Sequence, residues 1–317
     1  MLHFFYGRCQ TYLDITDTVL RFCCDGRHVH IPTGDRLRAT MFSDPAYGHL
    51  KEIVVISDRD GTLTCTTFPH DTPVDLPVPA GLVPPARSRP VLAVGPVDEI
   101  IARIHDQLQF IGGRLTDEWP EQTMVVRFLD PNAKVLEIGA NIGRNTLTIA
   151  SLLTDSANLV TMECDPAAVE ILRCNRRANG FAFRIEPSAL SCRPLIQRGW
   201  ETVPADEVRP GWKPVSTITF KDLVAKYGTA FDTLVADCEG ALFYILQDDP
   251  SILDGIRTVI LEADYLNVEH KLSVESVFAR QGLSQIHSEP LVVDWQHPFP
   301  DEVAASFFEV WTRTTRD

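Results

Sequence analysis

The segment VLEIGANIGRNTLTIA, residues 135–150, limits the possible folds of this chain more than any other segment. It begins with a nearly continuous apolar run, which is typical of a strand buried on both faces of a parallel sheet. Gly139 and Gly143 follow, and apolar residues then recur at helical spacing to about Leu153. A strand that passes through a glycine-bearing turn into a helix predicts an α/β fold, in which ligands bind at the carboxyl ends of the strands.

Strand and helix patterns alternate from this segment onward and predict a doubly wound, mostly parallel sheet of seven strands with six helices. Helix starts are expected at Asp165, Thr219 and Ser273, because these side chains can accept hydrogen bonds from the first free backbone amides. The seven strands are expected at residues 134–140, 158–164, 181–186, 231–238, 257–265, 284–295 and 307–314.

The first part of the chain differs in composition. Short β-like runs occur at residues 11–16, 28–32, 51–57 and 62–68. Residues 69–96 then contain eight prolines, which cannot donate backbone hydrogen bonds to a helix or a central strand. We therefore expect two domains, a small β-rich accessory domain with a proline-rich connection and a larger α/β domain, over residues 1–95 and 97–317.

The run VVISDRDGTL in the first part suggests two readings. Asp58 and Asp60 match the Asp-x-Asp-Gly-Thr opening of haloacid-dehalogenase-like phosphatases, in which the first Asp is a phosphoryl-accepting nucleophile. Asp60-Gly61 is also a strong turn signal between two strand-like runs. The hairpin is favoured, because the proline-rich segment follows where the phosphatase fold needs a helix.

Composition restricts the partners. The 43 acidic residues exceed the 29 basic ones and give a net charge of −14, which opposes binding to nucleic acid or to an anionic membrane. There is no apolar run of membrane-spanning length, and the first ten residues are too polar for a signal peptide. The eight cysteines have no zinc-site spacing and are expected to be reduced thiols. We expect a soluble, cytoplasmic protein.

The first turn indicates the class of ligand. Its pattern is Glu137-x-Gly139-Ala140-Asn141-x-Gly143, which is neither the G-x-G-x-x-G of dinucleotide sites nor a phosphate-binding loop. Glu163 ends the next strand, 20 positions after Gly143, where a carboxylate can accept hydrogen bonds from both ribose hydroxyls. Together these features predict a site for a nucleoside without phosphates.

Four motifs together resemble one known protein family. VLEIGANIG, VTMECDP, FDTLVADCEGALFYIL and ILEADY resemble the FkbM-type S-adenosylmethionine-dependent methyltransferases, over about residues 115–315. The resemblance implies a Rossmann-like class I methyltransferase sheet with S-adenosyl-L-methionine as the methyl donor. It implies that the first turn holds the methionine part, that Glu163 holds the ribose, and that Glu137 faces the donor's amino group. The implied donor-binding residues are Glu137, Gly139, Ala140, Asn141, Gly143, Glu163, Cys164, Ser188, Ala189 and Asp237, with Ser188 and Ala189 near adenine.

The resemblance also implies the acceptor. Asp-Cys-Glu-Gly stands after the fourth strand in place of the amino-methylating Asn/Asp-Pro-Pro-aromatic signature, which favours a hydroxyl on a sugar, glycan or natural product. Asp237, Glu239 and Glu262 are the expected catalytic residues. Two routes for the acceptor proton stay open. Asp237, Glu239 or a nearby histidine can act as a general base without metal. Alternatively, Asp237, Glu262 and Asp264 can converge at the strand ends, where acids hold a magnesium ion in metal-dependent O-methyltransferases. The metal-free route is favoured, because Glu239-Gly240 matches the family and the Asp-Asn metal pair after the fifth strand is missing.

Two other function classes stay open: a nucleic-acid methyltransferase of the cap-modifying type, and a donor-binding scaffold without turnover. The insertion at residues 192–214 matches no family segment. It can cover the acceptor pocket, but buried packing of its Trp200 and Trp212 is the favoured interpretation. Gly139→Val is expected to abolish donor binding while leaving the fold intact.

Overall fold

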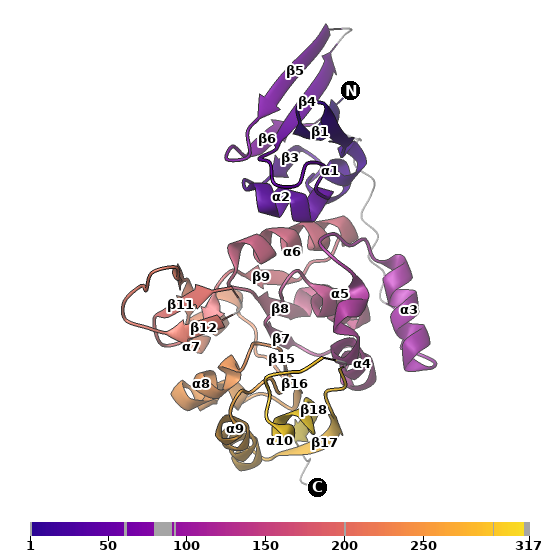
Figure 1. Ribbon diagram of the computed structural model, residues 1–317. Helices are drawn as coiled ribbons and strands as arrows, with labels where there is room; N and C mark the ends of the chain where they lie inside the picture. The colour runs from indigo at the N-terminus through magenta and orange to yellow at the C-terminus, as the bar shows by residue number, and fades with distance from the viewer. Residues whose placement is uncertain are drawn as a thin grey trace. The chain divides into compact units, whose positions relative to one another are not determined.

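The computed structural model of the chain describes residues 2–59, 62–78, 91, 93–199, 201–293 and 295–313 (Figure 1). The chain divides into two compact units. The first holds residues 1–88, 109–114 and 170–180, and the second holds the remainder. Residues 79–90 and 92 of the predicted proline-rich connection lie outside the described residues, and a domain boundary at residue 95 stays a prediction. Within the described ranges, no helix has the length and apolar character needed to cross a bilayer.

The first unit contains an antiparallel sheet in the order β2-β1-β4-β5 and a separate pair, β3 with β6. The four predicted strands are confirmed, but two further strands and two helices were missed. The buried Arg38 joins loops here, since its guanidinium donates to the carbonyls of Pro32, Pro69 and Thr72. The elements are β1 (Leu2–Arg8), β2 (Thr11–Asp14), α1 (Thr16–Phe22), β3 (His28–Ile31), α2 (Asp35–Phe42), β4 (Glu52–Arg59), β5 (Thr62–Phe68) and β6 (Val74–Pro77).

The hairpin reading of the Asp-x-Asp-Gly-Thr run is confirmed. β4 and β5 pair directly and antiparallel, with Asp58 opposite Leu63. Asp60 and Gly61, the predicted turn residues, lie outside the described residues. A nucleophilic Asp of the phosphatase type would need a helix after its strand. Here the next element after β4 is the antiparallel strand β5.

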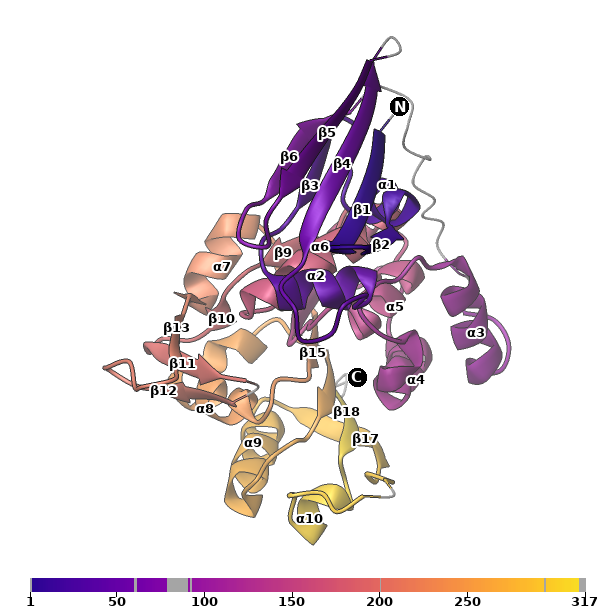
Figure 2. The same ribbon diagram turned by 45° about the horizontal axis from the view of Figure 1, so that its top comes forward.

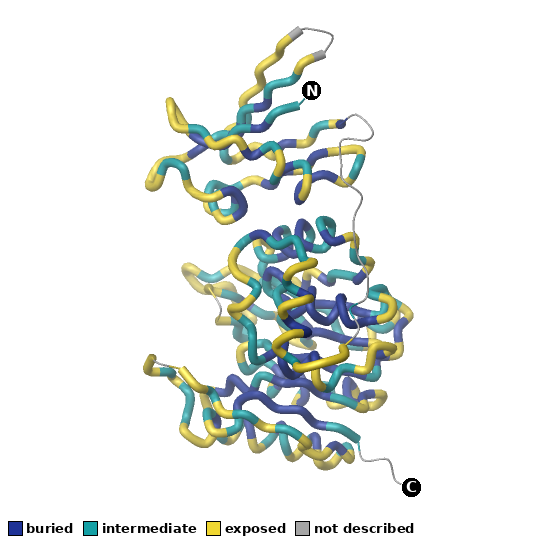
Figure 3. Tube along the Cα trace, turned by 90° about the vertical axis from the view of Figure 1, so that its right-hand side faces the viewer, coloured by how far each residue is buried: buried dark blue, intermediate teal, exposed yellow. Residues whose placement is uncertain are grey.

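The second unit is built on a seven-stranded sheet in the order β17-β18-β16-β15-β7-β8-β9. β18 runs antiparallel to both neighbours and all other pairs are parallel, so the predicted mostly parallel α/β sheet is confirmed. Every residue of β7, β8 and β15 is buried (Figure 3), as their apolar sequences require. The strands are β7 (Val135–Ile138), β8 (Leu159–Met162), β9 (Arg184–Glu186), β15 (Thr233–Ala236), β16 (Thr258–Glu262), β17 (Leu283–Glu289) and β18 (Phe308–Arg313).

The helix starts show which cap signals were sufficient. Asp165 accepts hydrogen bonds from the amides of Ala167 and Ala168, and Thr219 accepts from that of Asp222, so both predictions are confirmed. The predicted helix start at Ser273 is wrong. The helix begins six residues earlier, because Asn267 caps it by accepting a hydrogen bond from the Glu269 amide. The α-helices after residue 96 exceed the predicted six and are α3 (Val97–Gln107), α4 (Trp119–Phe128), α5 (Arg144–Leu152), α6 (Pro166–Asn179), α7 (Phe220–Tyr227), α8 (Ala241–Asp248), α9 (Val268–Arg280) and α10 (Asp301–Ala304).

The insertion forms a small antiparallel sheet in the order β12-β11-β13, on the side of α7 and α8 (Figure 2). Trp212 is half-buried, with the guanidinium of Arg198 4.7 Å from its ring centroid, so the predicted deep burial is wrong for this residue. Trp200 lies outside the described residues. The remaining elements are three short 3-10 helices, η1 (Leu115–Glu118), η2 (Ser156–Asn158) and η3 (Pro250–Leu253), and the strands β10 (Ala189–Leu190), β11 (Leu195–Arg198), β12 (Glu201–Pro204), β13 (Lys213–Val215) and β14 (Thr217–Ile218).

Candidate functional site

The register of the large sheet sets the predicted site residues in one row. Ile138 of β7 pairs with both Met162 of β8 and Ala236 of β15, and Ala236 pairs with Leu261 of β16. The next residue of each strand therefore occupies the same carboxyl edge. These residues are Gly139, Glu163, Asp237 and Glu262, and the strand order reverses between the first and third of them.

The fold itself requires a glycine at position 139, which the sequence analysis did not expect. Its φ of +95° lies in the left-handed region, and an added Cβ would lie 1.5 Å from the backbone carbonyl oxygen of Asp237. Because that neighbour is backbone, it cannot move aside as a side chain would. The expectation that Gly139→Val leaves the fold intact is therefore wrong: the glycine is needed for the approach of β7 to β15.

The turn after β7 uses all its amides internally. The amides of Gly139 and Ala140 donate to the Met162 carbonyl, at 3.1 and 3.0 Å. Asn141, with a φ of +48°, accepts through its side chain from the Ile142 amide at 2.8 Å. Gly143, with a φ of +98°, donates to the Ala140 carbonyl and leads into α5. No amide of residues 139–143 is left to bind a phosphate.

Glu163 closes this turn from the neighbouring strand. Its Oε2 accepts from the Asn141 amide at 2.8 Å, and its Oε1 accepts from the Asp165 amide at 2.7 Å. Burial raises the pKa of Glu163, and these backbone hydrogen bonds oppose that rise. Each oxygen retains a lone pair for a further donor. The carboxylate is thus held in one orientation and can still accept from hydroxyl groups.

The residues predicted near the ribose and adenine have close polar partners. Gln197 of β11 donates to the Cys164 sulfur at 3.7 Å, which brings the insertion next to Glu163. Ser188 is buried and donates to a carboxylate oxygen of Glu186 at 2.7 Å. Ala189 follows as the first residue of β10. An adenine-binding role for Ser188 and Ala189 stays a prediction.

Two carboxyls near the turn have strongly shifted pKa values. Burial raises the pKa of Glu137 to about 7, although its Oε2 accepts from the Thr161 hydroxyl at 2.6 Å. Burial and the charge of Glu121 raise the pKa of Glu118 to about 7. Glu118 accepts from the Asn145 amide at 3.1 Å, so a carboxylate already occupies the start of α5, where nucleotide phosphates commonly bind. Sequence analysis missed this residue.

A second acidic group lies on the other side of the strand-order reversal. Oxygens of Glu121, Asp237 and Glu262 all lie within 4.8 Å of one another. Asp264 is buried close by, where its Oδ1 accepts from the Gly240 amide at 2.8 Å. Sequence analysis missed Glu121, because the residues next to it, Pro120, Gln122 and Thr123, give no signal of a buried acid.

Glu239 differs from the other predicted catalytic residues. It is exposed and has a φ of +53°, which is rare for a residue other than glycine, asparagine or aspartate. It is not one of the three acids whose oxygens cluster. The structure therefore brings together Asp237 and Glu262 but not Glu239, and the catalytic roles of all three stay predictions.

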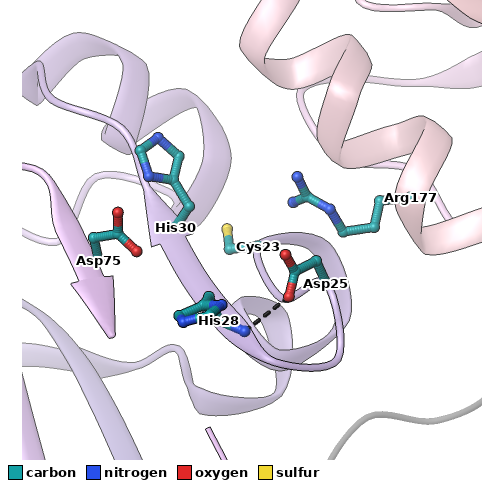
Figure 4. Close-up of a pocket in the computed structure, with 6 residues that line it drawn as sticks. All are labelled: Cys23, Asp25, His28, His30, Asp75 and Arg177. Atoms are coloured by element: carbon teal, nitrogen blue, oxygen red, sulfur yellow. Dashed lines mark hydrogen bonds between the residues drawn. The ribbon is translucent and has the colours of Figure 1, made fainter. Parts of the chain in front are cut away.

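A separate pocket of about 370 Å³ lies in the first unit (Figure 4). The His28 amide closes part of its wall by donating to Asp25 at 2.7 Å. None of its residues was predicted to bind a ligand, and it shares no residue with the strand-end site. The lining residues are Cys23, Asp25, His28, His30, Asp75 and Arg177.

Comparisons with known proteins give matches only at the level of structure. No protein-family model matches the chain, and no curated protein does. A ribosomal protein L11 methylase from Lactobacillus delbrueckii subsp. bulgaricus is similar, with a TM-score of 0.40, 12% identity, and coverage of 64% of this chain and 80% of that one. An O-methyltransferase from Bacillus cereus, in complex with SAH, has a TM-score of 0.38 and 14% identity, over 68% and 90%. A proposed RNA methyltransferase from Pyrococcus horikoshii has a TM-score of 0.40 and 11% identity, over 71% and 100%.

Proposed function

We propose that this chain is an S-adenosylmethionine-dependent methyltransferase of the FkbM type, acting on a hydroxyl of a sugar, glycan or natural product. One observation carries the proposal: the turn after β7 has no spare amide for a phosphate, while the next strand end presents an oriented carboxylate. Such a site suits a nucleoside whose ribose hydroxyls are free and whose remaining part carries no phosphate.

The proposed donor contacts follow the carboxyl edge of the sheet. Glu163 would accept hydrogen bonds from the ribose hydroxyls, and the backbone at Asn141 would border the methionine part. Glu137 would face the amino group, whose positive charge favours the ionised form of this buried carboxyl. These contacts complement a cationic donor and disfavour anionic nucleotides.

The chemistry needs alignment more than activation. The donor, when bound, supplies a methyl group on a positively charged sulfur, and the acceptor oxygen must approach in line with it. Asp237, at the point where the strand order reverses, would lie at the reacting centre. Glu262, at the end of β16, and Glu239, two residues after Asp237, would border the acceptor. An ionised carboxylate at this edge would accept the hydroxyl proton as a general base, and the acidic charge would oppose binding of a nucleic-acid acceptor.

Isothermal titration tests the donor site. The wild-type chain should bind S-adenosylmethionine and should not bind NAD⁺, which carries a pyrophosphate. Glu163→Gln should weaken donor binding by about 1–3 kcal/mol, since it removes charge from two hydrogen bonds. Glu201→Gln, at an exposed acid of β12, is the control and should bind as the wild type does. Equal donor affinity in Glu163→Gln and wild type would refute the ribose assignment.

A methyl-transfer assay then tests the acceptor class. Donor carrying an isotopically labelled methyl group should transfer label to a panel of sugars and hydroxylated natural products, and not to capped RNA. Label on RNA alone would replace the hydroxyl proposal with the nucleic-acid alternative. Donor binding with no transfer to any acceptor would favour the scaffold alternative.

A further inference from the structure

We propose that Glu121, Asp237 and Glu262 form a binding site for a hard divalent cation, of the Mg²⁺ or Mn²⁺ class. The three side chains come from three elements: α4, the end of β15 and the end of β16. α4 packs against β16, which sets Glu121 over the strand ends. Cation binding stands on this geometry alone, whereas the role of the cation rests on the proposed methyl transfer.

The distances suit one shared ion. A Mg²⁺, Mn²⁺ or Ca²⁺ ion binds carboxylate oxygens at roughly 2.0–2.6 Å, so oxygens on one ion lie no more than about 5 Å apart. The three oxygens here lie within 4.8 Å of one another. All three ligands are carboxylates, with no sulfur or imidazole among them, which favours hard cations over zinc or copper.

An unpartnered atom gives independent support. Glu121 is only 8% exposed, and no donor among the described residues reaches its Oε2. A buried carboxylate oxygen without a partner costs free energy unless a proton or a cation joins it.

Arg144 of α5 forms ion pairs with two acids outside this cluster. Arg144 pairs with Asp117 at 3.5 Å and with Glu118 at 3.2 Å. The net charge of the whole chain, −14, raises the local concentration of divalent cations.

The cation would have a defined place in the proposed reaction, and it would replace the metal-free route that the sequence favours. Three carboxylates leave coordination positions for water and for the acceptor hydroxyl, whose pKa falls when its oxygen binds the ion. The O–H bond breaks and its proton passes to solvent water. The oxygen then forms a bond to the methyl carbon as the carbon–sulfur bond breaks, and sulfur keeps the electron pair as a neutral thioether.

Binding of Mn²⁺ to the full chain, in the absence of donor and acceptor, tests the site. The electron paramagnetic resonance signal of free Mn²⁺ falls when the ion binds. The wild type should bind about one Mn²⁺ per chain, and Glu121→Gln and Glu262→Gln should each bind at least about tenfold more weakly. Glu163→Gln, a matched change at the end of β8 on the far side of β7, should bind Mn²⁺ as the wild type does and lose donor affinity instead.

Thermal unfolding shows whether the variants fold. Without metal, Glu121→Gln should unfold at the wild-type temperature or above it, because it removes a buried charge. Mn²⁺ should raise the unfolding temperature of wild type and of Glu163→Gln, and not that of Glu121→Gln. Wild-type protein that binds no Mn²⁺ at about 1 mM, or binding that both cluster variants retain, would overturn the site.

The two proposals can fail separately. Mn²⁺ binding without S-adenosylmethionine binding would retain the cation site and reject the methyltransferase. Donor binding and methyl transfer with no Mn²⁺ binding would retain the methyltransferase and reject the cation site. Protons alone would then neutralise the acidic cluster.

Discussion

At the scale of single residues, the backbone at Glu239 indicates a role that side-chain contacts do not. A φ of +53° for glutamate costs about 1–2 kcal/mol relative to the right-handed region, and such strain tends to persist at functional sites. Glu239 follows directly on the strand-end residues Asp237 and Cys238. This conformation lies in the turn between the end of β15 and the start of α8 at Ala241.

Replacing Glu239 by glycine separates strain from function. Glu239→Gly should raise the free energy of unfolding by up to about 1 kcal/mol, because glycine adopts this conformation without strain. It should also lower methyl-transfer activity. Cys9→Gly is the matched control, since Cys9 is exposed in the first unit with a φ of +57° and should gain stability without losing activity. Chemical denaturation and the labelled-methyl assay measure the two effects, and full activity in Glu239→Gly would remove this residue from the proposed site.

At the scale of elements, the approach of β7 to β15 depends on one glycine. A Cβ at Gly139 would overlap the Asp237 carbonyl oxygen, and β7 and β15 are both central and wholly buried. Gly139→Ala should therefore lower the free energy of unfolding by more than about 3 kcal/mol. Gly199→Ala also replaces a glycine with positive φ, but nothing described lies within 4 Å of its added Cβ, so a much smaller loss is expected. A Gly139→Ala chain as stable as Gly199→Ala would contradict this packing.

The elements also show what local sequence can predict. Strands buried on both faces have apolar runs, and caps such as Asp165 act on amides two or three residues away, so both were predictable. Ser273 failed because a serine inside a helix and a serine at its start have the same local signal, and Asn267 was overlooked. The helix α4, which carries Glu121, was also missed. Its acids show their importance only when packing brings them to strand ends more than a hundred residues away.

At the scale of the whole molecule, the sequence predicted the strand-end carboxyls at the carboxyl edge of the large sheet, but not those that other elements add. The alternation of strands and helices predicts parallel strands, whose carboxyl ends, with Glu163, Asp237 and Glu262, lie at one edge of the sheet. Glu118 and Glu121 join this edge from outside the sheet, so no strand pattern identifies them. Their addition turns a few predicted acids into a concentration of buried carboxyls, and this affects the stability of the chain as well as its chemistry.

The buried carboxyls predict how stability depends on pH. Glu118 and Glu137 each have a pKa of about 7 in the folded chain, raised by burial from 4.5. The folded chain therefore holds more protons than the unfolded chain between these values, so the free energy of unfolding should fall as pH rises through this window. Each shift corresponds to about 3 kcal/mol, and Glu137→Gln should remove the part due to Glu137 and flatten the profile. Urea unfolding at a series of pH values between 5 and 8 measures the slope, with Glu201→Gln as the exposed control.

A bound donor should lower the pKa of Glu137 and reverse its contribution to the pH dependence, because a positive amino group favours the ionised carboxylate. Stability that rises between pH 5 and 7 in the ligand-free wild type, or an identical slope in Glu137→Gln, would show that this carboxyl is already ionised in the folded chain.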